Sequence, residues 1–368
     1  MHLIITIALV STAIAYVLLI LYLRIGLERA DKAQCVEGFE PTVSIIVAAR
    51  NEELYIADCV TSLSHLDYPS DKLEIIVVND GSSDRTREIA ESYKPLHPHI
   101  RVITTTPGEG NLRGKTNAVA QGIDVSSGEI LMFTDADCVV PAEWVRNTVK
   151  YFDEKTAIVG GFTLLEADGA FEGMQTLDWI FLFGLASAMA GWKRPLTVIG
   201  NNLSVRRSAY DLTGSYRKIP FSVTEDYALV HAIVEKTCLE VRFPINPKAL
   251  VRSKACKSWN QLYRQKQRWG VGGLDMTFRS YLIMSIGWAF KLSLILSIFY
   301  SPAVMIASAV AAMSIVESRF LWKPLRQFGS LGSFKYLIAF ELYFALYTVA
   351  IPFIALISKK VVWKERHL

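Results

Sequence analysis

The stretch Glu129-Ile-Leu-Met-Phe-Thr-Asp-Ala-Asp137 decides the fold. Its apolar run predicts a buried strand, and the strand opens into two carboxylates, Asp135 and Asp137. Alternate residues of an extended chain point the same way, so both carboxylates can converge on one divalent cation that also binds phosphate oxygens. An Asp-x-Asp pair alone is usually a solvated loop, so its meaning depends on the surrounding chain.

The chain before this stretch alternates short β-branched runs with amphipathic segments. The predicted strands are Val43–Ala48, Leu73–Val78, Arg101–Thr104 and Ile130–Thr134, and the predicted helices lie near Glu52–Ser64, Arg85–Tyr93 and Asn117–Ala120. Strands that alternate with helices indicate an α/β fold with a mostly parallel sheet and helices on both faces. Ligands of such sheets bind beyond the carboxyl ends of the strands. We therefore expect one site at that edge.

The composition indicates a soluble domain joined to a membrane region. The chain has 368 residues, 51% of them apolar, and a formal net charge of +4. It is too apolar for a soluble enzyme and too charged in its middle for a bundle of membrane helices. Leu3–Leu23 has no charge and can cross a hydrocarbon core of about 30 Å at about 1.5 Å per residue. We predict an anchor at residues 1–24; a cleaved signal peptide, the alternative, would carry basic residues ahead of the apolar run.

Basic residues predict the orientation of this anchor. The residues that follow the first span are Arg24, Arg29 and Lys32. Positive residues favour the cytoplasmic side of a membrane. We therefore expect a multi-pass protein of the cell (inner) membrane whose central domain, residues 41–275, faces the cytoplasm.

A second membrane region is predicted at residues 281–358, with two or three helices. Tyr281–Val316 is interrupted by Lys291 and Tyr336–Ser358 by Glu341, and we expect both charged groups to reach toward the interface. The first segment is either an interfacial helix plus one span or a hairpin bent near Pro302. Each arrangement leaves one basic segment outside, against the positive-inside bias, whereas a second segment that is re-entrant around Pro352 would not. The two basic segments are a loop with Arg319, Lys323, Arg326 and Lys335, and a tail with Lys359, Lys360, Lys364 and Arg366.

Four further motifs accompany the Asp-x-Asp pair. They are Val77-Val-Asn-Asp-Gly-Ser-Ser-Asp84, Gly114-Lys-Thr-Asn117, Thr224-Glu-Asp226 and Gln265-Lys-Gln-Arg-Trp269. This ordered set resembles the family 2 glycosyltransferases, in the branch that includes cellulose, chitin and hyaluronan synthases and ceramide glucosyltransferase. The resemblance covers Pro41–Gly273 and implies a GT-A type, Rossmann-like domain. Many relatives have Asp-Asp-Gly-Ser where this chain has Asn79-Asp80-Gly81-Ser82, and the retained acid is the second.

The resemblance implies that the strand ends hold the nucleotide of a sugar donor. The implied donor-binding residues are Ala49, Arg50, Glu52, Asp80, Lys115 and Asp135, and the implied ligands of a divalent cation, Mg²⁺ or Mn²⁺, are Asp135 and Asp137. Asp80 can accept hydrogen bonds from the base or ribose, and Lys115 can offer a cation to phosphate. The cation would neutralise charge on the leaving diphosphate. A plain strand-to-helix turn capped by Asn51, and a solvated Lys115, are the simpler alternatives.

Asp226 is the candidate general base. An acceptor hydroxyl is a poor nucleophile near neutral pH, so a carboxylate must accept its proton as it attacks the anomeric carbon. A single base favours one in-line displacement with inversion. The alternative is that Glu225 and Asp226 only cap the helix that follows them.

Gln265, Arg268 and Trp269 are the candidate residues closest in sequence to the second membrane region. Helical spacings of three and four place them on one face. Arg268 can clamp a diphosphate, and Trp269 can offer the acceptor an apolar platform. A packed tryptophan beside a surface arginine is the ordinary explanation of such a pair.

The expected reaction is the transfer of one sugar from a nucleoside diphosphate donor, UDP-linked, to a membrane lipid. The expected partners are this donor, a lipid or glycan acceptor and the membrane, without nucleic acid. A lipid is favoured because the predicted membrane region is small and apolar, whereas a polymer channel needs several inward polar groups. A processive synthase that extends a glycan chain is the alternative, since the motif at Gln265–Trp269 also occurs in processive relatives. The five cysteines show no zinc spacing, so metal binding must rest on oxygen.

Overall fold

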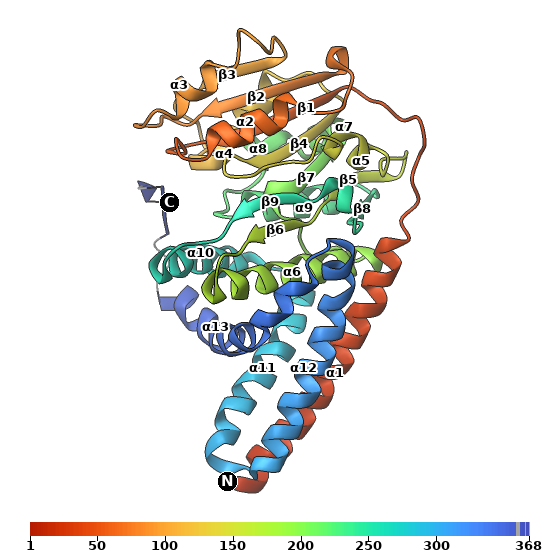
Figure 1. The fold of residues 1–368 in the computed structure, drawn as a ribbon, viewed down its shortest axis with the longest axis vertical. Helices are drawn as coiled ribbons and strands as arrows, with labels where there is room; N and C mark the ends of the chain where they lie inside the picture. The colour runs from red at the N-terminus through yellow and green to blue at the C-terminus, as the bar shows by residue number, and fades with distance from the viewer. Residues whose placement is uncertain (358–360, 365, 368) are drawn as a thin grey trace.

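A seven-stranded sheet forms the centre of the upper half of the molecule in the computed structural model, which describes residues 1–357, 361–364, 366 and 367 (Figure 1). The strands, in spatial order, are β3 (Ile100–Thr104), β2 (Leu73–Asn79), β1 (Val43–Ala49), β4 (Ile130–Asp135), β7 (Leu203–Arg206), β5 (Thr156–Gly160) and β8 (Glu240–Arg242). The first four strands are parallel, and β7 is antiparallel to both of its neighbours. The predicted mostly parallel sheet is confirmed, and the inserted β7 was not predicted.

Register brings the ends of the central strands together. Ala49 at the end of β1 pairs with Asn79 of β2, and Ala48 pairs with Asp135 of β4. Nearly every side chain of these three strands is buried, as expected of parallel strands that are covered on both faces. The carboxyl ends of β1, β2 and β4 therefore form one edge, where the predicted motifs lie.

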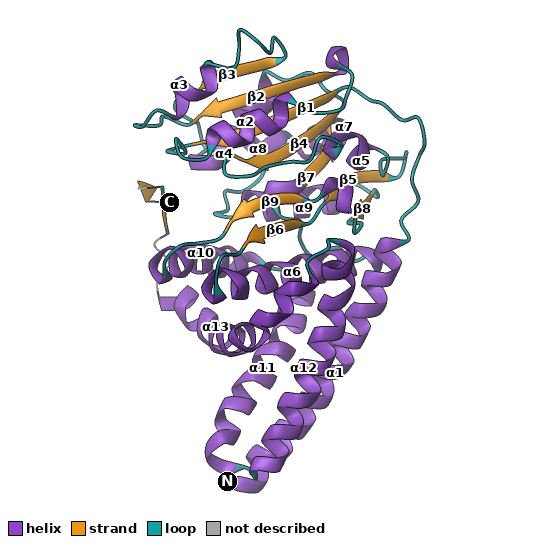
Figure 2. Ribbon diagram, viewed as in Figure 1, coloured by secondary structure: helices purple, strands orange, loops and turns teal. Residues whose placement is uncertain are grey.

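Helices surround this sheet (Figure 2). They are α2 (Ile56–Ser64), α3 (Thr86–Glu91), α4 (Gly114–Asp124), α5 (Trp144–Val149), α7 (Arg207–Thr213), α8 (Ser215–Lys218) and α9 (Glu225–Lys236). Ile45 and Val47 of β1 pack in a cluster with α2 and α5, whereas Ile46 packs in a second cluster with α4. Alternate strand residues thus serve opposite faces. The 3₁₀ helices are Ser70–Lys72, Gly200–Asn202, Pro247–Ala249, Gly273–Asp275 and Leu331–Tyr336.

A layer of two long helices lies between the sheet and the lower bundle. β6 (Thr163–Glu166) pairs in parallel with β9 (Val251–Lys254), and these strands lead to α6 (Ala170–Gly191) and α10 (Trp259–Gly272). α6 is buried along most of its length and contacts helices of the bundle below it. The upper domain therefore rests on the bundle through α6 and α10 (Figure 1).

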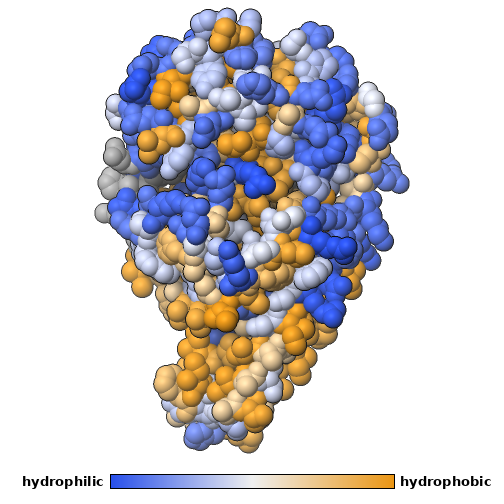
Figure 3. Space-filling model, viewed as in Figure 1, coloured by the Kyte–Doolittle hydropathy of each residue, from blue (hydrophilic) through white to orange (hydrophobic). Residues whose placement is uncertain are grey.

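The described residues contain four helices that are long and apolar enough to cross a membrane. They are α1 (His2–Asp31), α11 (Phe278–Tyr300), α12 (Ala303–Gln327) and the segment Leu331–Ile357, which includes α13 (Leu337–Ile357). Apolar atoms dominate the surface of the lower bundle (Figure 3). His2 Nδ1 lies 2.7 Å from Tyr300 O, so the start of α1 lies beside the turn between α11 and α12. The predicted hairpin bent at Pro302 is therefore the arrangement observed, and α1 continues beyond the predicted boundary at residue 24.

α13 lies across the upper end of the bundle, below α6 and α10 (Figure 1). Its buried residues are Phe340, Ile351 and Ala355, and its exposed apolar residues are Ile338, Leu342, Leu346, Phe353, Leu356 and Ile357. Lys364 beyond it contacts Glu52 of the upper domain, so the tail returns to that side. α13 is thus a continuous helix that runs sideways, and not a re-entrant turn at Pro352.

The predicted basic loop is wrong, because most of its residues belong to a helix. Arg319, Lys323 and Arg326 lie in α12, whose end contacts the end of α1: Lys323 Nζ lies 2.8 Å from Asp31 Oδ2. Both basic segments, as far as they are described, therefore lie on the side of the upper domain. Lys359 and Lys360, and residue 358 of the predicted boundary, lie outside the described residues.

The expectation that Lys291 reaches toward the interface is wrong. Lys291 is fully buried, and its Nζ lies 3.0 Å from Glu317 Oε1 and 3.6 Å from Glu341 Oε2. Tyr16 donates a hydrogen bond to the same Glu317 oxygen. The network joins α1, α11, α12 and α13, so these polar groups connect the helices of the lower bundle.

Candidate active site

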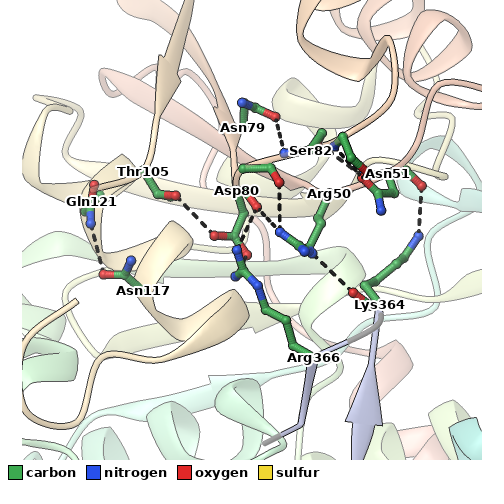
Figure 4. A network of polar contacts seen from close by, with 12 residues as sticks. Arg50, Asn51, Asn79, Asp80, Ser82, Thr105, Asn117, Gln121, Lys364 and Arg366 are labelled. Atoms are coloured by element: carbon green, nitrogen blue, oxygen red, sulfur yellow. Dashed lines mark hydrogen bonds and ion pairs between the residues drawn. The ribbon is translucent and has the colours of Figure 1, made fainter. Parts of the chain in front are cut away.

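The ends of β1 and β2 hold the first group of predicted residues (Figure 4). Ala49 O accepts a hydrogen bond from Asp80 N at 2.8 Å, and Arg50 Nη1 donates to Asp80 O and Gly81 O at 2.6 and 2.9 Å. Gly81 has a φ of 60°, which only glycine adopts freely. Asp80 is 2% exposed, and its Oδ1 accepts from Thr105 Oγ1 at 3.1 Å. Arg50 therefore holds the turn that presents Asp80.

Asn51 and Glu52 continue this edge. Asn51 Oδ1 accepts from Ser83 N at 3.0 Å and α2 begins only at Ile56, so the capping alternative for Asn51 is wrong. Burial raises the pKa of Glu52 to about 7, with Lys364 lowering it and the nearby Asp137 raising it. Glu52 thus faces the carboxylates of the Asp-x-Asp pair.

Lys115 lies between two carboxylates and not in solvent. Its Nζ is 2.7 Å from Asp135 Oδ1 and 2.8 Å from Glu225 Oε1. Burial would lower the pKa of Lys115, but the two carboxylates outweigh burial and raise the pKa above its usual value. Burial likewise opposes ionisation of Asp135, but the ammonium holds the pKa of Asp135 below its usual value. The solvated-lysine alternative is wrong, and Asp135 is ionised.

Asp137 completes the predicted cation site. Burial and then the charge of Asp135 raise the pKa of Asp137 to about 6. A divalent cation would favour the ionised form of both carboxylates, and oxygen ligands suit Mg²⁺ and Mn²⁺. Within the described parts of the chain, no three His, Cys, Asp or Glu side chains are grouped to hold a metal. The remaining ligands would therefore be phosphate oxygens and water, which fits a cation that arrives with a diphosphate.

The candidate base lies at the same cavity as the lysine. The charged residues that line this cavity are Lys115, Asp135, Glu225 and Asp226. Asp226 Oδ1 accepts from Tyr227 N at 2.8 Å within the first turn of α9, and Oδ2 accepts from Gly200 N at 2.7 Å. Helix capping therefore explains the hydrogen bond at Oδ1 but not the one at Oδ2. Burial and the adjacent Glu225 raise the pKa of Asp226 to about 6, which suits a group that accepts a proton near neutral pH.

α10 packs against the loop that carries the candidate base. A Cβ at Gly272 would lie 2.4 Å from Thr224 Oγ1, and Arg268 Nη1 donates to Val223 O at 3.3 Å. Burial raises the pKa of Asp135, and the positive charge of Arg268, after that of Lys115, contributes to holding this pKa below its usual value. Gln265 Oε1 is buried and has no hydrogen-bond partner among the residues that the structure describes. Arg268 thus contacts the loop that precedes the candidate base, and the substrate contacts of Arg268 and Gln265 stay predictions.

Trp269 is packed against other side chains. Its ring lies 5.7 Å from that of Trp179, and Lys266 Nζ lies 4.2 Å from the ring centroid. Lys266 also forms a buried ion pair with Asp178. The ordinary explanation, a packed tryptophan, describes these contacts, and the acceptor platform stays a prediction.

Two parts of this site were not predicted. Glu225 was considered only as a helix cap, although its acid directly precedes the base. Lys364 and Arg366 were noted only for membrane topology. Their contacts with Glu52 and Asp80 join positions about 300 residues apart, as the Arg366–Asp80 separation of 286 shows. A basic pair near the chain end was the only sequence signal for them.

Known proteins are similar to this chain in sequence and in fold. Residues 44–222 match the family model described as Glycosyl transferase family 2. The chain is 30% identical over 239 residues to a probable glycosyltransferase YdaM of Bacillus subtilis (strain 168), which covers 63% of this chain and 55% of that protein. It is 29% identical over 269 residues to the beta-monoglucosyldiacylglycerol synthase of Synechocystis sp. (69% and 53%). It is 27% identical over 252 residues to a poly-beta-1,6-N-acetyl-D-glucosamine synthase of Staphylococcus epidermidis (67% and 57%). The chain thus spans about half the length of these relatives.

The fold is similar to that of the mannosyltransferase PcManGT from Pyrobaculum calidifontis, solved in complex with GDP-Man and Mn²⁺. The TM-score is 0.62 at 18% identity, over 93% of this chain and 98% of that one. Residues 44–222 therefore form a glycosyl transferase family 2 domain, and the domain built on the seven-stranded sheet has the GT-A fold.

Proposed function

We propose that this protein is a membrane-bound inverting glycosyltransferase that moves one sugar from a UDP-linked donor to a membrane lipid. One observation carries the proposal: Lys115, Asp135, Glu225 and Asp226 border a single cavity at the strand ends. A cation for phosphate, a metal-binding acid and a base thus share one space. α10 contacts α13, and this contact links the catalytic domain to the proposed membrane helices.

Donor binding uses the edge formed by β1, β2 and β4. Asp80 accepts hydrogen bonds from the base or ribose, and Lys115 exchanges a carboxylate partner for a phosphate oxygen. Asp135 and Asp137 would hold the divalent cation, Mg²⁺ or Mn²⁺, which supplies positive charge to the leaving diphosphate. The GDP-Man and Mn²⁺ bound to the similar mannosyltransferase are consistent with a nucleotide sugar and a divalent cation.

Transfer then requires one proton acceptor. Asp226 takes the proton of the acceptor hydroxyl while its oxygen forms a bond to the anomeric carbon. The bond from that carbon to the diphosphate oxygen breaks, and the nucleoside diphosphate leaves with its electron pair. The attack and the departure are on opposite sides of the sugar, so the configuration inverts.

A lipid acceptor is supported by the arrangement of α13. Its exposed apolar side chains, among them Leu342 and Leu346, suit a helix that lies in the membrane surface. α10 sits directly on this helix, since a Cβ at Gly270 would contact Ile351. The name of one relative, beta-monoglucosyldiacylglycerol synthase, favours the same class of acceptor.

The alternative is a polysaccharide synthase, which the name of another relative favours. A channel for a hydrated polymer needs inward polar groups that are free to contact it. Lys291 and Glu317 are instead 0% exposed and paired with one another. We therefore prefer a single transfer to lipid.

The same arrangement favours a cytoplasmic active site. α1, α11 and α12 are the proposed spans, and α13 is the proposed surface helix. The described basic residues of both segments, Lys323 and Lys364 among them, then lie with the catalytic domain, in agreement with the positive-inside bias.

Reconstitution with radiolabelled UDP-sugars and membrane lipids tests the proposal. We expect a chloroform-soluble product of low mass that requires Mg²⁺ or Mn²⁺ and is absent with the Asp226→Asn variant. A long, glycosidase-degradable polymer would favour the synthase. Absence of transfer to either acceptor class from any UDP-sugar would contradict the proposed donor.

A further inference from the structure

The C-terminal tail lies in the donor end of the site (Figure 4). It forms a short hairpin of β10 (Val362–Trp363) and β11 (Arg366–His367). Arg366 Nη1 lies 2.7 Å from Asp80 Oδ2, and Nη2 donates to Asp80 O at 3.2 Å. The tail therefore binds both the side chain and the backbone of the acid to which we assign the nucleoside.

Lys364 makes a second set of contacts on the same edge. Its Nζ lies 2.7 Å from Glu52 Oε1 and 3.3 Å from Asn51 O, and its backbone O accepts a hydrogen bond from Arg50 Nε at 3.2 Å. Two tail residues thus contact Arg50, Asn51, Glu52 and Asp80. These residues follow the ends of β1 and β2, where we place the donor.

The docked tail competes with a donor for Asp80. Oδ1 of Asp80 accepts from Thr105, Oδ2 is paired with Arg366, and the residue is only 2% exposed. A carboxylate oxygen can accept more than one hydrogen bond, so the competition rests on access: with Arg366 in place, Asp80 is nearly fully buried and a base or ribose does not reach it.

The charges of the tail replace those of a loaded donor. Arg366 and Lys364 bring two positive charges to an edge with Asp80 and Glu52, and the charge of Lys364 also reaches Asp135 and Asp137. A divalent cation brings the same two charges. The acidic edge is thus neutralised either by the tail or by the cation that accompanies the diphosphate.

We propose that the C-terminal hairpin is a built-in competitor of the sugar donor: it occupies Asp80 and Glu52 in the resting enzyme and leaves when a nucleoside diphosphate sugar binds. The inference rests on the proposed function, because it needs a donor at this edge.

The hairpin is held weakly enough for a donor to displace it. Each strand of the hairpin is two residues long, which is too short to be stable alone. The side chains of Arg366 and Lys364 are 37% and 32% exposed, so solvent screens both ion pairs. A docked tail of this kind lowers the apparent donor affinity by the fraction of molecules in which the site is open.

Calorimetry with UDP and Mn²⁺ on the full-length protein in detergent tests the competition. Arg366→Ala should bind UDP about three- to tenfold more tightly than wild type, since it removes the competing group. Arg366→Lys should fall between them, because a lysine keeps the charge but loses the two-point contact with Asp80. Arg217→Ala is the matched control, because it breaks an arginine–aspartate pair with Asp124 outside this site. It should bind UDP as wild type does.

Hydrogen exchange tests the docking itself. Without ligand, Arg366→Ala should speed amide exchange in residues 79–84, whereas Arg217→Ala should not. UDP with Mn²⁺ should speed exchange in residues 361–364, 366 and 367 of wild type while it protects residues 79–84. Protection of both segments by UDP, or equal UDP affinity in wild type and Arg366→Ala, would overturn the inference and leave the proposed function intact. Absence of UDP binding in all four proteins would overturn the proposed function, and the competition with it.

Discussion

Two lysines of this protein have the same ion-pair chemistry in different surroundings. Each lies between two carboxylates from other helices or strands: Lys115 between Asp135 and Glu225, and Lys291 between Glu317 and Glu341. Lys115 borders a cavity, and the side chain of its partner Asp135 is 36% exposed. Lys291 and Glu317 are 0% exposed.

The difference shows how burial separates a binding site from a structural one. A partner of Lys115 can be exchanged for phosphate, because the side chain of Asp135 is 36% exposed and can be reached from solvent. Lys291 has no such exchange open to it, since four helices enclose it and any lost partner leaves a buried charge. One lysine between two carboxylates can therefore form part of a binding site at Lys115, whereas the same arrangement at Lys291 holds helices together.

The largest predicted effect is on the enclosed lysine. Lys291→Met should lower the free energy of unfolding by about 3–5 kcal/mol, because it leaves two buried carboxylates without their cation. Thermal unfolding in detergent measures this loss. The UDP affinity of the folded fraction should not change, since the site lies in the other region.

A double variant separates charge from packing. Lys291→Met with Glu317→Gln removes one uncompensated charge and should recover part of the lost stability. If the single variant were as stable as wild type, or lost UDP binding while folded, the division between the two regions would be wrong.

The second effect concerns the rate of transfer. Asp226→Asn should lower kcat about a hundredfold or more, because the amide keeps the shape but cannot accept the proton. UDP affinity should stay near that of wild type. Steady-state kinetics with calorimetry measure both quantities, and normal turnover by the purified variant would contradict the assignment of the base.

The third effect concerns Lys115, the lysine of the candidate active site. Lys115→Met should weaken UDP binding about tenfold through the loss of a phosphate partner. Its effect on unfolding should be well below that of Lys291→Met, because Asp135 remains accessible to water and cations. Calorimetry and thermal unfolding on the two methionine variants test this contrast. Equal destabilisation by both would show that cavity access does not distinguish the lysines.

Local sequence patterns predicted the parallel half of the sheet. β1, β2, β3 and β4 lie within a residue of their predictions, because each is a run of β-branched or aliphatic residues between polar turns. β7 and β8 are three- or four-residue strands whose pairing depends on the rest of the sheet, so local pattern could not find them. α12 extended past the apolar run because its basic residues contact the end of α1.

The site was predicted as far as its members follow strands. Asp80 and Asp135 were found from strand ends. Glu317 was missed because it lies one residue beyond the apolar segment that was considered, and Arg366 was missed because its partner is 286 residues away. Partner choice over such separations depends on tertiary packing, which no local pattern records.

The smallest predicted effect is the pH dependence of transfer. Burial and Glu225 raise the pKa of Asp226 to about 6, against the opposing charge of Lys115. A base must be ionised to act, so kcat should be nearly full at pH 7 and roughly tenfold lower at pH 5. Protonation of Glu52, whose pKa is raised to about 7, should appear in KM for the donor, because that residue lies at the donor edge.

Stability distinguishes this decline from acid unfolding. Because the pKa of Asp226 is higher in the folded than in the unfolded protein, its contribution to stability is fully present below the unfolded value and is lost as pH rises through about 6. Acidification from pH 7 to 5 therefore strengthens the fold at this residue while it removes the base. Rates measured across pH 5–8, with thermal unfolding at each pH, should show that kcat falls on acidification. Asp226 should contribute no loss of stability over the same range. A kcat that stays constant to pH 5 would exclude a base of this pKa and would place the proton acceptor elsewhere in the cavity.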